Sequence, residues 1–325
     1  MTSSSGELTF YESHINDRGV LLTETLPGLV IRLVLQVLGL WGNLSVAYVT
    51  YKHKHLRTTC GILLSICVIA DAVHESSHDF FAYLIFTKIN FTSLRTCVLV
   101  NILPIIGLNT GCILTLCLAI DRLICVLFPI ASRRISKYTF VAFYCFINFC
   151  VSAWIMLEVY FSYSKLDPNQ EIICLISDAM PGSSGSTWFL MSLITGAMTV
   201  VCYIAVWVML RVKSSQKNST TKRMFKSLFT LGLIVFCTWM VNGAGNMYLT
   251  WTGADPVTHW RVSYDIGVAV NVACSANYYV LLLLSNDYRN AFKAQLNINS
   301  SSIFVPSRAS QTIAPIGSKI RLPTM

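Results

Sequence analysis

The stretch that decides the fold runs from Cys97 to Arg122 and reads CVLVNILPIIGLNTGCILTLCLAIDR. It is uncharged and mostly apolar until it reaches Asp121. A helix rises about 1.5 Å per residue, so its ends would lie about 37 Å apart, slightly more than the roughly 30 Å hydrocarbon core of a bilayer. The stretch therefore predicts a membrane-spanning helix with a cysteine at one membrane face and an Asp-Arg pair at the other.

The composition of the whole chain also indicates a membrane protein. Of its 325 residues, 54% are hydrophobic and 12% are charged, whereas soluble domains carry about 25% charged residues. The formal net charge is +9, but the basic residues lie in short segments between apolar runs and do not alternate with aromatic residues. A nucleic-acid partner is therefore not expected, while contact with anionic membrane lipids is.

Seven apolar runs are each long enough to cross a bilayer. They lie at about 28–50, 60–86, 97–127, 138–161, 186–210, 224–250 and 261–284. No internal repeat is evident, which disfavours many transporter folds. We expect an all-α membrane protein, a seven-transmembrane helix bundle followed by a short interfacial helix.

The basic residues predict how the chain is oriented. Most of the 24 lysines and arginines fall in segments on one side of the seven runs, and the positive-inside rule places that side in the cytoplasm. We expect a multi-pass plasma-membrane protein with an extracellular N-terminal segment at 1–26, a bundle at 27–285, and a cytoplasmic C-terminus. Tyr288, Phe292 and Leu296 share one face of an interfacial helix at 286–297, and a Ser-rich disordered tail follows at 298–325.

Cysteine positions predict one disulfide. Ten of the 12 cysteines lie within or beside apolar runs, where cysteine behaves as a small buried hydrophobe. Only Cys97 and Cys174 fall at the outer, oxidising face, so we expect them to form a bridge that holds the segment after the fourth run over the mouth of the bundle. Asn90 begins an Asn-Phe-Thr triplet on the same side and is a candidate glycosylation site.

Charged residues inside the predicted spans need a reason, because each costs at least about 2.5–3.5 kcal/mol at the bilayer centre on insertion scales. They are Arg32, Asp71, Glu75, Asp79 and Glu158. The three acids of the second run recur every four residues and so share one face, beside His74 and His78. One reading is a satisfied polar seam between the first, second and seventh spans. Arg32 has a depth similar to Asp79 and Glu75, so we expect an ion pair with one of them.

Chemical catalysis and metal binding are not expected. His74 and His78 are one helical turn apart, but no third ligand is in sight. No set of nucleophile, base and orienting group is recognisable. The seventh run has no lysine for a retinal Schiff base, and no other cofactor is expected.

Several motifs together resemble the rhodopsin-like G-protein-coupled receptors, and their degeneracy most resembles the nematode serpentine chemoreceptors. The motifs are Gly42-Asn43, Asp71, Asp121-Arg122-Leu123 in place of Asp-Arg-Tyr, Trp239 as the sixth-span toggle tryptophan, and Asn277 in place of the Asn of Asn-Pro-x-x-Tyr. The departures are the missing prolines of spans six and seven, where Val241 and Tyr278 stand, and Leu281 in place of the tyrosine.

The resemblance implies a receptor that binds an extracellular small-molecule or peptide ligand and activates a heterotrimeric G protein. It implies a ligand site at Ile105, Leu108, Trp239, Asn242, Asn246 and Asn271. It further implies a coupling and switch set of Asp121, Arg122 and Asn277, and a sodium or water cluster of Asn43, Asp71 and Asn277. The alternative is a seven-span ion or solute transporter that uses the acidic face of the second span.

The first prediction concerns activity without ligand. In many receptors of the resembled family an acid eighteen residues before the toggle tryptophan restrains the Arg of Asp-Arg-Tyr, whereas the matching residue here is Thr221. An ion pair near water is worth about 0.5–1 kcal/mol, and about 1.4 kcal/mol is tenfold. We expect Thr221→Glu to lower basal G-protein activation a few-fold at equal surface expression, and Thr221→Gln to leave it unchanged. Equal basal activity in the Glu variant would contradict this restraint.

Overall fold

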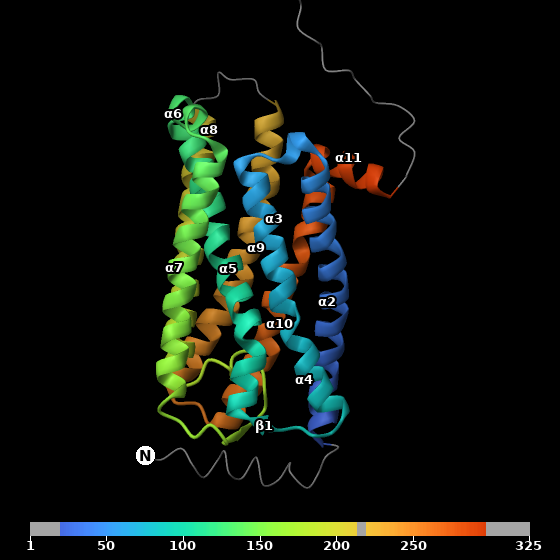
Figure 1. Cartoon of the computed structure of the whole chain (residues 1–325), viewed down its shortest axis with the longest axis vertical. Helices are drawn as coiled ribbons and strands as arrows, with labels where there is room; N and C mark the ends of the chain where they lie inside the picture. Colours follow the sequence, from blue (N-terminus) through green and yellow to red (C-terminus); the bar gives the residue numbers. More distant parts are fainter. Residues whose placement is uncertain (1–19, 213–218, 297–325) are drawn as a thin grey trace, which may run out of the picture.

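Seven long helices lie side by side in this computed structural model, which describes residues 20–212 and 219–296 (Figure 1). Each is long and apolar enough to cross a membrane. They lie at Thr23–Lys52, Thr59–Phe86, Leu94–Leu127, Lys137–Tyr163, Ser183–Met209, Phe229–Thr252 and Thr258–Leu284. All seven predicted spans are thus confirmed, with ends that differ from the expected ones by a few residues.

The described elements follow one another in chain order and include almost no strand. They are α2 (Val20–Lys52), η1 (Lys54–Leu56), α3 (Thr59–Glu75), α4 (Ser77–Phe86), β1 (Thr92–Ser93), α5 (Leu94–Leu127), α6 (Pro129–Arg134), α7 (Lys137–Tyr163), β2 (Glu171–Ile172), α8 (Ser183–Val212), α9 (Ser219–Thr252), α10 (Pro256–Leu284) and α11 (Asn286–Gln295). Of the expected extracellular segment 1–26, residues 1–19 lie outside the described residues, and the expected tail 298–325 lies wholly outside them.

The two ends of the bundle differ in what closes them. At the end drawn lowest in Figure 1, β1 pairs antiparallel with β2, and the predicted disulfide is formed, with 5.5 Å between the Cα atoms of Cys97 and Cys174. We call this the disulfide end. At the opposite, α11 end, Tyr288 and Phe292 of α11 are buried, and Tyr288 Oη lies 3.0 Å from Thr50 Oγ1 of α2. Leu296, expected on the same face, is 47% exposed.

The second span is not one continuous helix, as its sequence predicted, but breaks at Ser76. The amide of Ser76 bonds to Val73 O and that of Asp79 to Ser76 O, so this turn has three residues where a regular helix has 3.6. The tighter turn rotates the side chains that follow. Asp71 and Glu75 remain buried, but Asp79 is exposed and accepts a hydrogen bond from Gln36 Nε2 at 2.8 Å.

Two glycines let α5 approach α3 closely. A Cβ atom at Gly107 would lie 2.6 Å from the backbone oxygen of Ala70, and one at Gly111 would lie 2.6 Å from Asp71 Oδ1. Any side chain at these positions would separate the two helices. The approach therefore fixes the depth and orientation of Asp71 within the bundle.

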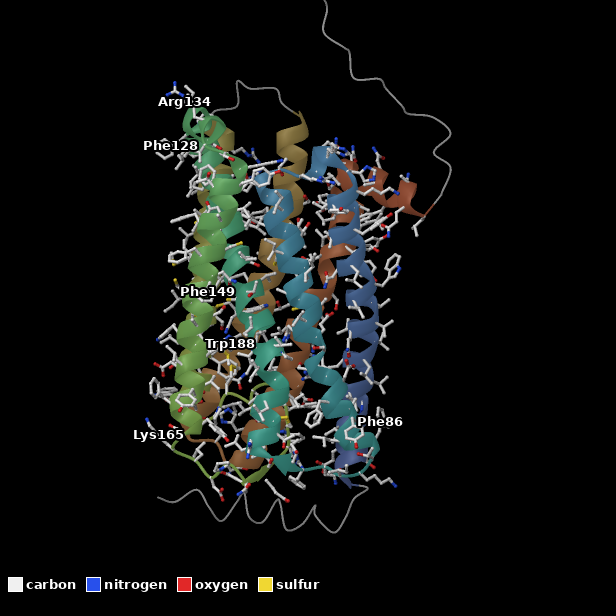
Figure 2. The ribbon with its side chains drawn as sticks, in the orientation of Figure 1. Phe86, Phe128, Arg134, Phe149, Lys165 and Trp188 are labelled. Atoms are coloured by element: carbon white, nitrogen blue, oxygen red, sulfur yellow. A yellow bond between two sulfur atoms is a disulfide. The ribbon has the colours of Figure 1, made fainter. Side chains whose placement is uncertain are left out.

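Large apolar side chains cover the outside of the bundle. Phe149, labelled on α7 in Figure 2, and Val37 of α2 are each 68% exposed. Hydrocarbon solvates such side chains as well as a protein core does. The exposed apolar surface is thus what a membrane-spanning bundle requires, in agreement with the predicted fold class.

The disulfide generates the second prediction. It closes a loop of 77 residues, and removing a native disulfide of this kind commonly costs about 2–5 kcal/mol. We expect Cys174→Ser to lower the thermal unfolding temperature of the detergent-purified protein by several degrees. The exposed free thiol of Cys150 provides the control, since Cys150→Ser should have no such effect. Equal unfolding temperatures for the two variants would show that the bridge is dispensable.

Candidate functional site

A cavity lies among the helices toward the disulfide end. Its polar lining comes from five helices and from the segment between β2 and α8, and the helices contribute Arg32 of α2, His74 of α3, His78 of α4, Asn242 of α9 and Asn271 of α10. Apolar side chains such as Leu108 of α5 form much of the rest. The space that centres of water-sized groups can occupy is about 60 Å³.

The segment between β2 and α8 lies against this cavity. Leu175, Ile176, Ser177 and Met180 all contribute to its lining, and the adjacent Cys174 is bonded to α5. The segment also contains an internal hydrogen bond, which the amide of Leu175 donates to Asp178 Oδ2 at 3.0 Å. The segment therefore has a fixed position over the bundle mouth, as the sequence predicted.

The structure brings the six residues of the predicted ligand site into one region, but not all line the cavity. Leu108, Asn242, Asn246 and Asn271 do. Ile105 is fully buried in the apolar cluster beside it. Trp239 is also in that cluster and reaches the cavity through Trp188, with 5.7 Å between the two ring centroids.

Trp188 is a lining residue that the sequence analysis missed. It is labelled in Figure 2 in the half of the bundle nearer the disulfide end, and its Nε1 donates to Asn109 Oδ1 at 2.7 Å. His74 and His78 were assigned to the polar seam, yet both line the cavity. A tryptophan in an apolar run does not differ in sequence from the other aromatic residues of the spans, so its place at the cavity could not be predicted. Two histidines one helical turn apart inside a span are polar and could have suggested a cavity.

The amide side chains of the cavity are partly bonded to one another. Asn246 Nδ2 donates to the backbone oxygen of Asn242 at 2.8 Å, and Ser263 Oγ donates to Asn246 Oδ1. His78 Nε2 lies 2.8 Å from Asn271 Oδ1, so the ring donates and the amide oxygen accepts. Asn271 Nδ2 is buried and has no partner.

The expected ion pair of Arg32 with Asp79 or Glu75 is not formed. Arg32 Nη2 donates to the backbone oxygen of Tyr264, and its guanidinium lies 4.5 Å from the centre of the Tyr264 ring. Glu75 Oε1 accepts instead from Ser275 Oγ at 2.9 Å. The break at Ser76 explains the difference, because the tighter turn directs Asp79 toward Gln36.

The predicted cluster of Asn43, Asp71 and Asn277 is assembled by direct contact. Asn277 Nδ2 lies 2.8 Å from Asp71 Oδ2 and 3.3 Å from Asn43 Oδ1, and Asn43 Nδ2 donates to the backbone oxygen of Cys274 at 3.1 Å. The cluster therefore joins α2, α3 and α10 near the middle of the bundle. Elsewhere in the described ranges, no group of three His, Cys, Asp or Glu side chains is placed to hold a metal ion.

Asp121 and Arg122 lie near the α11 end of α5 and bond to each other. Arg122 Nε donates to Asp121 Oδ2 at 3.0 Å, and the two side chains are 14% and 4% exposed. Within the described part of the chain, Arg122 makes no ion pair with another helix. Arg122 is therefore held by the residue that precedes it on the same helix.

Asn90, the candidate glycosylation site, has a side chain that is 1% exposed and a backbone φ of 65°, in the left-handed region. Its glycosylation stays a prediction. The Asn-x-Thr triplet alone could not reveal this burial.

Comparison with known proteins agrees with this arrangement. The family described as serpentine type 7TM GPCR chemoreceptor Srsx matches residues 36–296. The somatostatin receptor type 2 of Mus musculus is 25% identical over 283 residues, which cover 80% of this chain and 74% of that receptor. The same receptor of Sus scrofa is 24% identical over the same coverage.

The third prediction concerns the pH dependence of the loop. Burial raises the pKa of the Asp178 carboxyl to about 7, although the Leu175 amide and the Ser177 side chain act in the opposite direction. An acid whose pKa is higher in the folded than in the unfolded protein stabilises the fold below its unfolded pKa, and this contribution is lost as the pH rises through about 7. We expect the unfolding temperature to fall between pH 5.5 and 8.5, and to fall less in Asp178→Asn. Identical pH profiles would exclude Asp178 as the cause.

Proposed function

The chain belongs to the Srsx family of serpentine chemoreceptors, which are seven-transmembrane G-protein-coupled receptors, and from this we propose where it binds its ligand and its G protein. The cavity beneath the disulfide-bonded loop is the ligand site. The α11 end is the face that binds a heterotrimeric G protein. The disulfide end and segment 1–26 are then extracellular and segment 298–325 is cytoplasmic, which is the orientation expected from the basic residues.

One observation carries this proposal: polar and aromatic contacts follow one another from the cavity to the opposite end. Trp188 lines the cavity and contacts Trp239. Trp239 shares an apolar cluster with Cys274 of α10, whose backbone oxygen accepts from Asn277 Nδ2 at 3.1 Å. Asn277 also bonds to Asp71 of α3, and α3 packs against the glycines of α5. Since α5 also carries Arg122 at the α11 end, a ligand that shifts the aromatic pair has a packed route to the coupling face.

The polar cluster and the Asp121–Arg122 pair have separate roles in this proposal. Asn43, Asp71 and Asn277 set the relative positions of three helices, and a bound sodium ion or water molecules would compete with their direct bonds. Arg122 is released from Asp121 when the G protein binds. The protein performs no chemistry on its ligand, and anionic lipids contact its basic cytoplasmic segments.

The transporter alternative is not favoured. Its ion path required Asp71, Glu75 and Asp79 on one face, but Asp79 lies outside the bundle and Glu75 is bonded to Ser275. Family membership agrees with a receptor. Ligand-dependent current or uptake in a reconstituted bilayer without G protein would revive the transporter reading.

The fourth prediction tests the coupling face. Cells that express the chain are screened with small volatile compounds and short peptides, with G-protein activation as the readout. For any agonist found, we expect Arg122→Ala to reduce maximal G-protein activation at least tenfold. Saturable agonist binding should persist, because the substitution removes a charge at the coupling face and leaves the cavity unchanged. Arg95→Ala, at the disulfide end, is the matched control and should signal normally. Full signalling by Arg122→Ala would place coupling elsewhere.

A further inference from the structure

Arg32 is a buried charge without a counter-charge. Its side chain lines the cavity although the residue is only 5% exposed. Among the described residues, the ion pairs are those of Arg122 with Asp121 and of Arg261 with Glu24. Arg32 therefore brings one positive charge to the cavity, and no described side chain neutralises it directly.

Each acidic side chain near Arg32 either accepts a hydrogen bond from another residue or is exposed. Asp79 accepts from Gln36 and Glu75 from Ser275. Asp265 follows Tyr264 on α10 but is exposed. No aspartate or glutamate is among the described residues that line the cavity. The missing negative charge must therefore come from outside this lining.

Several N–H donors at the cavity also lack an acceptor. Arg32 has five N–H groups, yet only Nη2 has a hydrogen bond, to a backbone oxygen, and the buried Nε has none. Asn271 Nδ2 is likewise buried and unpartnered. Both Arg32 Nε and Asn271 Nδ2 can only donate, so a ligand that accepts hydrogen bonds would satisfy them.

The free-energy cost of burying a guanidinium also favours a negatively charged ligand. Removing such a charge from water is costly unless an opposite charge and hydrogen bonds compensate. The Tyr264 ring, 4.5 Å away, offsets part of that cost through a cation–π contact. The planar fork of a guanidinium matches the two oxygens of a carboxylate and forms two parallel hydrogen bonds with it.

Resting on the proposed receptor function, we propose that the cavity binds a small organic carboxylate, whose anionic group pairs with Arg32 and accepts from Asn271. The apolar part of the ligand contacts Leu108, Val270 and Trp188, which also line the cavity. One water requires about 10–15 Å³ of such space, and the cavity offers about 60 Å³. A ligand of roughly four to six non-hydrogen atoms is the size class that fits.

The first experiment measures binding without signalling. Receptor purified in lipid nanodiscs is heated with straight-chain carboxylates of two to eight carbons, with their amides and methyl esters, and with inorganic sulfate. At least one carboxylate should raise the unfolding temperature by several degrees, while its neutral analogues and sulfate do not. Equal stabilisation by the amide or by sulfate would overturn the proposal, and so would the absence of any carboxylate effect across the panel.

Variants assign the effect to Arg32. Arg32→Gln keeps a donor but removes the charge, and should weaken the stabilising carboxylate at least tenfold in half-maximal concentration. Arg32→Lys should retain part of the effect, because a point charge replaces the fork. Arg261→Gln, at the same end but paired with Glu24, is the control and should bind as wild type. Unchanged binding by Arg32→Gln would overturn the assignment, and if that variant does not fold, the comparison of carboxylate with amide on the wild type still decides.

A second readout separates this proposal from the proposed function. The same carboxylate should activate a G protein in cells that express the wild type and not in cells that express Arg32→Gln. If the carboxylate stabilises the purified protein through Arg32 but no G protein responds, the ligand class stands and the signalling proposal fails. If volatile neutral compounds activate signalling and carboxylates neither bind nor activate, the receptor function stands and the ligand class is wrong.

Discussion

Hydrocarbon offers no hydrogen-bond partner, so every polar side chain within the seven spans must find one inside the bundle. This constraint orders the centre of the structure. Asn277 satisfies Asp71 and Asn43 together, and in doing so holds three helices in register. Glu75 and Ser275 join α3 to α10 in the same way. The constraint is left unmet at several buried groups, and two of them, Arg32 Nε and Asn271 Nδ2, belong to residues that line the cavity, where the proposed carboxylate would be the missing partner.

Much of this architecture could be predicted from the sequence, because its causes are local. A span needs only length and apolarity, so all seven were found. The disulfide followed from exclusion, since Cys97 and Cys174 alone were expected on the oxidising side. The contact among Asn43, Asp71 and Asn277 was expected from the resemblance to the rhodopsin-like receptors, whose motifs place an amide or a carboxylate at each of these positions.

The remainder depended on features without a local signal. A three-residue turn at Ser76 leaves Asp79 exposed, so Asp79 does not pair with Arg32 as expected. Nothing in the sequence around Ser76 predicts that turn. The burial of Asn90 depends on the path of a loop, which a sequence triplet does not reveal. The cavity lining includes Trp188, which is one aromatic residue among many in apolar runs. The expected partner of Arg32 was wrong because a regular helix was assumed where the chain departs from it.

The close approach of α5 to α3 also limits how this receptor can vary. At Gly107 even a methyl group would meet the backbone of Ala70, and backbone cannot be exchanged for something smaller. Glycine is therefore the one residue that fits at position 107, whatever ligand the receptor detects. Leu108, the next residue, lines the cavity instead, so side chains of other sizes there would change the cavity and leave the contact between the two helices intact. The helix thus places a position that must remain glycine directly beside one that shapes the cavity.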